Sequence, residues 1–171
     1  MQAILNGRVV QRGNELTLHI ELVDVNTETA LWSADYNRPM TNLVSLPGEI
    51  ARDVSNKLQL KLSGADERRV TKNYTSNTEA YELYLRGRFH VFKMTLPEAG
   101  TGVSYFQRAI EIDPNYALAY VGLANAYRSF ALSGDMPAEY FPQAKEAAQK
   151  AVEIDDGLAE ACCTRLYHIL V

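Results

Sequence analysis

The fold of this chain is decided by a short stretch that occurs twice. Residues 109–120 read AIEIDPNYALAY, and residues 151–162 read AVEIDDGLAEAC. Each copy runs from the end of one apolar helical pattern, through an acidic turn, into the start of the next. A segment that recurs in this way indicates a repeat architecture, in which similar units stack on one another. We therefore expect an array of helices that acts as a binding scaffold rather than as a catalyst.

The sequence around the two copies predicts a wholly helical region from residue 77 to residue 171. Ser76 and Glu79 have the spacing of a capping box, and so do Thr95 and Glu98, where Pro97 suits a first helical turn. The predicted helices cover about residues 78–93, the stretch between Thr95 and Pro114, residues 116–130, a fourth segment that starts at Pro137 or Pro142 and ends at 154, and a last helix from about 158. Short turns between such helices predict hairpins that pack side by side.

This helical region resembles the tetratricopeptide repeat family. Residues 120–127, YVGLANAY, are similar to the family pattern W-x₂-L-G-x₂-Y, and residues 102–114, GVSYFQRAIEIDP, are similar to its second half, A-x₃-F…P. The following repeat keeps Ala144, Ala148 and Ala151, with Asp156 in place of the proline. The resemblance covers about residues 76–171 and implies about two and a half repeats.

In that family the first helix of each hairpin lines a concave groove that binds peptides or proteins. The resemblance implies that this groove is lined by Tyr81, Tyr84, Arg88, Leu118, Val121, Asn125 and Arg128. Asn125 and Arg128 would hydrogen-bond a peptide backbone or a carboxylate, and the tyrosines would supply apolar contact. The alternative is that the tyrosines are packing residues between hairpins, while Arg88 and Arg128 are solvated.

Residues 1–64 read as a small β-β-β-α segment. Strands are expected at 3–12, 15–24 and 30–36, with a two-residue turn at Gly13-Asn14 that fixes the first hairpin in register. Arg12 then lies opposite Glu15, Val9 opposite Leu18, Gly7 opposite Ile20, Leu5 opposite Leu22, Trp32 opposite Leu22 and Ala34 opposite Ile20. The next helix is expected to cover the apolar face of this sheet.

That helix carries an apolar stripe and is expected to end near residue 62. The stripe consists of Leu46, Ile50, Val54 and Leu58, with Ser45 as a candidate N-cap. A polar linker over 65–76 then separates the first domain, 1–64, from the helical domain, 77–171. The fold class is therefore α+β: a three-stranded antiparallel meander with one helix, followed by an all-α array.

The N-terminal half resembles the last part of the TolB-amino-terminal-like domain. Four short motifs occur in the order of that domain: NGRVVQRGN at 6–14, LVD at 22–24, LWS at 31–33 and YNR at 36–38. In bacterial signalling proteins this domain often precedes repeats similar to EAYELYLRGR at 79–88, and a kinase, nucleotide cyclase or winged-helix domain lies further upstream. The first half of that domain is not found in these residues, so we carry no kinase, cyclase or DNA-binding activity over to them.

Composition excludes several classes of function. A net charge of −4 and the absence of basic runs argue against nucleic-acid binding, and no apolar stretch reaches the roughly 20 residues of a membrane span. No phosphate loop, nucleophile elbow or metal-binding cluster is found, so we expect no catalytic residues, no metal and no cofactor. The adjacent Cys162 and Cys163 read as packing residues. The compartment predicted is the cytoplasm, with the periplasmic side of a membrane-anchored protein as the alternative.

The sequence thus predicts a non-catalytic protein–protein interaction module of a bacterial regulatory protein. The alternative is a self-association module that forms a homodimer through an open sheet edge and an uncapped last helix. An enzyme of unknown type is a third and weaker hypothesis.

Overall fold

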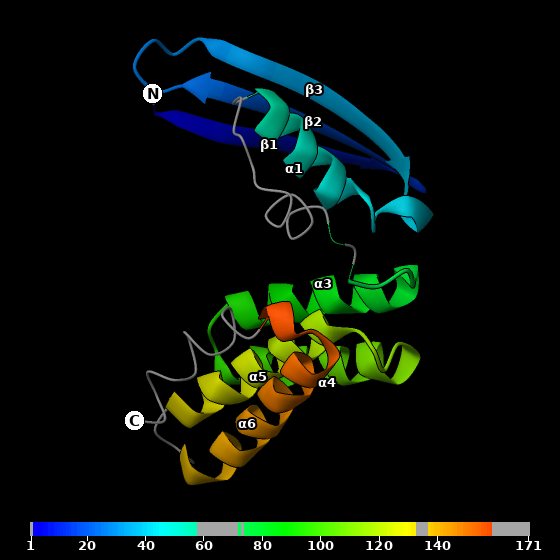
Figure 1. Cartoon of the computed structure of the whole chain (residues 1–171), viewed down its shortest axis with the longest axis vertical. Helices are drawn as coiled ribbons and strands as arrows, with labels where there is room; N and C mark the ends of the chain where they lie inside the picture. Colours follow the sequence, from blue (N-terminus) through cyan, green and yellow to red (C-terminus); the bar gives the residue numbers. More distant parts are fainter. Residues whose placement is uncertain (1, 58–71, 73, 133–136, 159–171) are drawn as a thin grey trace. The chain divides into compact units, whose positions relative to one another are not determined.

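The computed structural model describes residues 2–57, 72, 74–132 and 137–158 (Figure 1). The chain divides into two compact units, Met1–Asn73 and Tyr74–Val171. The first contains a three-stranded antiparallel sheet and a helix, and the second is helical, so the predicted α+β class is confirmed. Most of the predicted linker, and the predicted last helix with Cys162 and Cys163, lie outside the described residues.

The first unit is built on an antiparallel meander of strands β1 (Ala3–Arg12), β2 (Glu15–Asp24) and β3 (Ala30–Pro39), in the order β1-β2-β3. Gly13 occupies the left-handed region at φ 60°, as the two-residue turn requires. The expected partners are all confirmed, from the pair at the turn to Leu5 opposite Leu22 and Trp32 opposite Leu22. One irregularity between Leu22 and Val23 was not predicted.

Helix α1 (Leu46–Lys57) lies against one face of the sheet (Figure 1). It follows a short 3₁₀ turn, Met40–Asn42. The core beneath it is formed by Ile20, Leu22, Tyr36, Leu43 and Leu46. The Tyr36 hydroxyl donates a 2.7 Å hydrogen bond to Asp53, which joins β3 to the helix.

A second polar link joins the same two elements. Arg38 of β3 donates to Glu49 of α1 at 2.6 Å, and the Ser45 hydroxyl donates to the same side-chain carboxylate at 2.8 Å. These hydrogen bonds, that from Ser45 first, lower the pKa of Glu49. Because both links reach β3, the helix covers β2 and β3 but not β1: Leu5 and Val9 remain 49% and 61% exposed. The expectation that this helix would cover the whole apolar face is therefore wrong.

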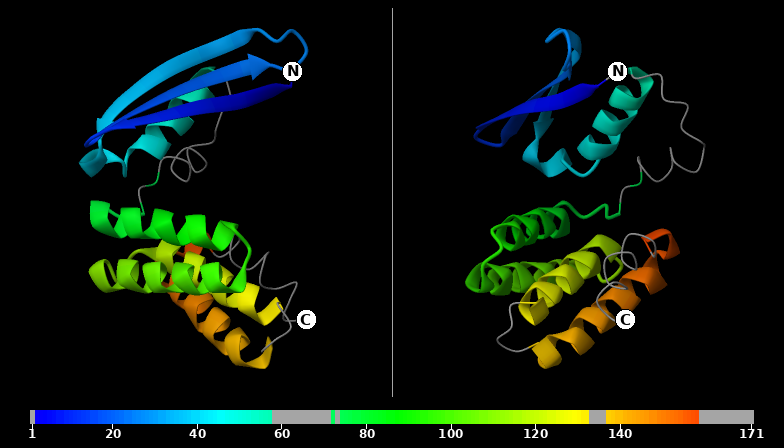
Figure 2. Two further views of the ribbon diagram at one scale, coloured as in Figure 1. Left: turned by 180° about the vertical axis from the view of Figure 1, so that it is seen from behind. Right: turned by 90° about the vertical axis from the view of Figure 1, so that its left-hand side faces the viewer.

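In the second unit the described residues form four α-helices, each of which packs on the next (Figure 2). They are α3 (Thr78–Phe92), α4 (Leu96–Ile112), α5 (Ala117–Leu132) and α6 (Pro137–Ile154), followed by a 3₁₀ turn at Asp156–Leu158. None of the helices that the structure describes combines the length and the apolar character needed to cross a membrane. The short connections make neighbouring helices into hairpins.

The starts of α3 and α4 differ from the predicted capping boxes. The N-cap of α3 is Asn77, whose side chain accepts from the Ala80 N–H at 3.1 Å, and not Ser76. Thr95 is the N-cap of α4, as expected, but its side chain makes no capping hydrogen bond. Glu98 is engaged elsewhere, by His90 and Lys93, so it does not complete a box.

Small residues and a few aromatic rings form the core of the helical unit. Ala80, Ala109, Ala119 and Ala126 are fully buried, which allows the helices to approach closely. Phe106 and Tyr116 are the largest fully buried side chains among the described residues. The Tyr84 ring joins them, with centroid distances of 5.9 Å to Phe106 and 5.2 Å to Tyr116. Tyr84 and Tyr116 are thus first of all packing residues.

Candidate functional site

A cavity of about 530 Å³ lies between α3 and α5, the first helices of the two hairpins. Five of the seven residues expected to line a groove line this cavity: Tyr84, Arg88, Val121, Asn125 and Arg128. The other lining residues are Leu85, Phe89, Val91, Phe92, Phe106, Gly122 and Ser129. We call this cavity the α3–α5 groove.

The remaining two expected residues lie elsewhere. Tyr81 and Leu118 are partly buried against the hydrophobic core and do not line the groove. Burial raises the pKa of the Tyr81 hydroxyl, and its ring lies 6.5 Å from that of Tyr84. For Tyr81 the packing role, which was the alternative at the sequence level, describes the structure better.

Phe106 of α4 contributes to the lining of the groove from beneath and is only 1% exposed. Its ring fits between two glycines, Gly87 of α3 and Gly122 of α5. A Cβ atom at Gly87 would lie 2.7 Å from the Phe106 ring, and one at Gly122 would come closer still. Any side chain at either position would therefore displace the ring, so the two glycines set the width of the groove.

The polar part of the groove is cationic. Neither Arg88 nor Arg128 forms an ion pair with a carboxylate of the described residues. The guanidinium of Arg88 lies 5.7 Å from the centroid of the Tyr84 ring, a cation–π arrangement. The Arg128 Nε atom is buried and lacks a hydrogen-bond partner within the part of the chain that the structure describes. Two cationic groups and the Asn125 amide are thus available for an acceptor.

The exposed apolar side chains of the groove lie on α3. Leu85, Phe89 and Phe92 line the cavity and are 38%, 61% and 86% exposed. Their spacing of four and then three residues places them on one face of the helix. Exposed aromatic side chains beside a cationic centre are a common composition for protein-binding surfaces.

A second cavity, of about 650 Å³, lies between α5 and α6. It is lined in part by Glu146, Lys150 and Glu153, and Lys150 already pairs with Glu153 at 2.9 Å. That pair raises the pKa of Lys150, with the hydrogen bond as the main cause. Because Lys150 is already paired with Glu153, this cavity has less free positive charge for a ligand than the α3–α5 groove has.

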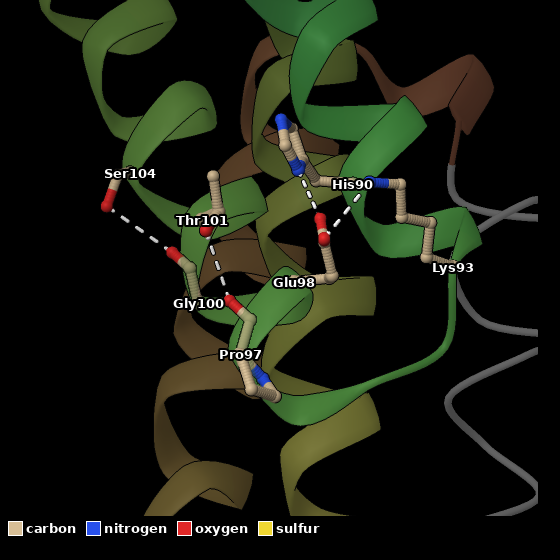
Figure 3. Close-up of polar contacts among 7 residues, drawn as sticks. All are labelled: His90, Lys93, Pro97, Glu98, Gly100, Thr101 and Ser104. Carbon is tan, nitrogen blue, oxygen red and sulfur yellow. Dashed lines mark hydrogen bonds and ion pairs between the residues drawn. The ribbon is translucent and has the colours of Figure 1, made fainter.

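The end of α3 is tied to the start of α4 by a polar cluster (Figure 3). The Glu98 carboxylate accepts hydrogen bonds from His90 Nδ1 and from Lys93, the latter at 3.0 Å. These hydrogen bonds, that from His90 first, lower the pKa of Glu98. The His90 ring also stacks on Tyr105, with 5.3 Å between the ring centroids. The cluster fixes the turn that leads away from Phe89 and Phe92.

Of the histidines that the structure describes, His90 lies on α3, and His19 lies on β2 beside two acidic side chains. Its Nδ1 atom lies 2.7 Å from Asp35 across the sheet, and its Nε2 atom lies 3.5 Å from Glu21. These partners raise the pKa of His19, the hydrogen bond to Asp35 most of all. Within the described residues no group of three or more histidine, cysteine or acidic side chains is placed to hold a metal ion.

Sequence reasoning missed seven of the twelve residues that line the groove, among them an apolar stripe and a glycine. The stripe Leu85, Phe89 and Phe92 has helical spacing, and it lies on α3 apart from the residues that this helix places in the core, which are Ala80, Leu83 and Tyr84. A helix that is apolar on two sides indicates two partners, and this was the available signal. Gly122 was also missed. No sequence pattern assigns it, because the need for glycine comes from a ring on another helix.

Comparisons with known proteins place these two units in context. No family model matches the chain. The chain is similar to putative adenylate cyclase 3 of Rhizobium meliloti (strain 1021), with 27% identity over 155 residues. The similarity covers 89% of this chain and 26% of that protein. The chain therefore spans about a quarter of the length of the curated relative that it matches.

Proposed function

We propose that the helical unit is a tetratricopeptide-like interaction module of a bacterial regulatory protein, and that it binds a peptide in the α3–α5 groove. The observation that carries this proposal is the convergence of Arg88, Asn125 and Arg128 on one cavity with an apolar rim. The two arginines have no carboxylate partner among the described residues, so a ligand is their natural source of acceptors.

The groove favours an acidic peptide with apolar neighbours. A carboxylate between Arg88 and Arg128 would form charge-assisted hydrogen bonds, while Phe89 and Phe92 would cover adjacent apolar side chains. The Asn125 side chain also lines the groove, and its amide can both donate to and accept from a peptide backbone. Affinity would then depend on the carboxylate and on the aromatic rim together.

The module is proposed to be non-catalytic. The relative bears the name of a cyclase, and this chain is similar to about a quarter of it. We infer that the shared segment is an accessory module, which recognises a partner while another part of a longer protein carries out any chemistry. Incubation of the 171-residue chain with ATP and Mg²⁺ or Mn²⁺ should yield no cyclic AMP above a blank. Sustained production would contradict the proposal.

The groove is tested with a defined peptide set. Fluorescently labelled peptides that carry one glutamate between two apolar residues are compared with the same peptides carrying glutamine. Arg128→Gln and Asn125→Ala should weaken binding of the glutamate peptides by roughly 10-fold or more, as expected for a lost hydrogen bond to a charged group. The glutamine peptides should bind the native chain about as weakly as the glutamate peptides bind these two variants.

Arg86→Gln provides a matched control. Arg86 is exposed, lies on the same helix as Arg88 and does not line the cavity. This variant has the same net charge as Arg128→Gln, so a general electrostatic effect would appear in both. Equal losses in the two variants, or no loss in Arg128→Gln, would refute the groove assignment.

A further inference from the structure

Strand β1 forms one edge of the sheet that the structure describes. It pairs with β2 over ten consecutive residues, Ala3–Arg12, and has no neighbour on its other side in the described sheet. It contains no proline and no bulge. The opposite edge, β3, ends in Pro39 and contains the irregularity that leaves Leu31 without a partner on β2. Proline and bulges are features that keep edges from pairing, and only β3 has them.

Apolar side chains are exposed on both faces of β1. Leu5 and Val9 lie on the face that α1 covers only over β2 and β3, and they are 49% and 61% exposed. Ile4, on the other face, is 53% exposed. A strand that has free backbone groups and apolar side chains on both faces is suited to pairing with another strand.

The register of the hairpin identifies the free backbone groups. In a hairpin with a two-residue turn, the closing pair, here Arg12 and Glu15, is hydrogen-bonded, and the bonds then recur at every second residue. The N–H and C=O groups of the residues between, Leu5, Gly7 and Val9 among them, therefore point away from β2. Another strand could form hydrogen bonds with these groups.

We propose that β1 pairs antiparallel with β1 of a second copy of this chain, with Gly7 on the two-fold axis. In this register Leu5 lies opposite Val9 of the second copy, Ile4 opposite Val10, and Asn6 opposite Arg8. Apolar residues meet apolar residues on both faces, and no like charges are opposed. The two sheets become one sheet of six strands, and the exposed parts of their apolar faces adjoin at the axis.

Other registers are worse. A shift that centres the pair on Arg8 places two guanidinium groups opposite each other and puts Ile4 opposite Arg12. A centre on Asn6 puts Ile4 opposite Arg8. A shift by an odd number of residues would set the apolar face of one strand against the polar face of the other. Of the registers compared, the strand sequence therefore favours the one centred on Gly7.

The inference is independent of the peptide groove, which lies in the other unit. Cysteine cross-linking tests it directly in the full chain with Cys162→Ser and Cys163→Ser. A Cβ atom at Gly7 meets only ordinary contacts, at 3.7 Å or more, so Gly7→Cys fits the single chain. In the proposed register the two introduced thiols face each other across Cα atoms about 5.5 Å apart, within reach of a disulfide.

Gln11→Cys in the same background is the matched control. Gln11 is exposed on the same strand and the same face, but in this register the two copies of residue 11 lie more than about 20 Å apart, at roughly 3.3 Å per residue. With a mild oxidant, Gly7→Cys should form disulfide-linked dimers at least about 10-fold faster than Gln11→Cys. Equal rates would show random collision and overturn the register.

Light scattering on the native chain measures the association itself. The native chain should be dimeric, and Val9→Lys should raise its dissociation constant by at least about 10-fold, because two buried ammonium groups would enter each interface. Ser33→Lys, an exposed position on β3, should leave it unchanged. A native chain that is monomeric at high concentration, or equal effects of the two lysines, would contradict the proposal.

Discussion

The ring of Phe106 occupies the space in which Gly122 would carry a side chain. Phe106 lies on α4 and Gly122 on α5, and a Cβ atom at Gly122 would overlap the ring edge. Gly87 lies on α3, the helix that forms a hairpin with α4, and a Cβ atom there would overlap the same ring. One buried aromatic side chain thus holds three helices at a spacing that only glycine permits, and the α3–α5 groove opens above it.

Gly122→Ala should destabilise the helical unit despite the higher helix propensity of alanine. Its methyl group must displace Phe106, whose side chain is 1% exposed, so we expect a loss of about 1–3 kcal/mol in unfolding free energy. Urea denaturation followed by circular dichroism measures it. Gly100→Ala is the control, because a Cβ there has its nearest neighbour at 3.8 Å. That variant should be unchanged or gain up to about 1 kcal/mol.

Thr75→Val should loosen the start of α3. The Thr75 hydroxyl is buried, donates to Asp113 Oδ2 at 2.6 Å and accepts from the Asn77 N–H at 3.0 Å. Valine keeps the shape but leaves both groups without their partner, which should cost about 1–3 kcal/mol. Thr101→Val removes an exposed hydroxyl that bonds only to its own helix, and it should change stability by less than about 0.5 kcal/mol. Similar losses in both variants would argue against a special role for Thr75.

The same contact explains why the N-cap of α3 could not be predicted. Thr75, Ser76 and Asn77 are three consecutive residues that can each cap a helix. The choice of Asn77 depends on Thr75 being held by Asp113, 38 residues further along the chain. A local pattern contains no information about such a partner. The strand register, in contrast, follows from a two-residue turn and strict alternation, both of which are local, and it was predicted correctly.

The residues that line the groove could be predicted only in part. The resemblance to tetratricopeptide repeats implied that Arg88 of α3 and three residues of α5 line one groove. The structure brings all four to one cavity, the residues of α5 being Val121, Asn125 and Arg128. Tyr81 lies one turn from Tyr84, yet it packs against the core, because the exact rotation of α3 is set by Phe106 and its glycines. The packing between helices, and not the spacing of residues in the sequence, therefore decides whether Tyr81 faces the groove or the core.

His19 should titrate with a pKa above its ordinary value of 6.5, because the protonated ring is stabilised by Asp35 and Glu21. A raised pKa in the folded state means that protonation contributes stability below pH 6.5, and that this contribution is lost as the pH rises through the folded pKa. Asp35→Asn removes the main cause, so the pKa should fall toward the ordinary value. Imidazole proton shifts measured by NMR between about pH 5 and 9 give both values. An unchanged pKa in Asp35→Asn would contradict the assigned hydrogen bond.

Met94→Gly should stabilise the helical unit. Met94 follows the C-cap of α3 with φ at 55°, the left-handed conformation that glycine adopts without strain, and its side chain is 90% exposed. Removal of the side chain therefore loses little packing and relieves about 1 kcal/mol of backbone strain, part of which is offset by the greater entropy of glycine in the unfolded chain. Met94→Ala loses the same exposed side chain but keeps the strained conformation, so it serves as the matched control. The glycine variant should unfold at a higher urea concentration than both the native chain and the alanine variant. If glycine is no more stable than alanine, the turn after α3 does not hold residue 94 in the left-handed region in solution.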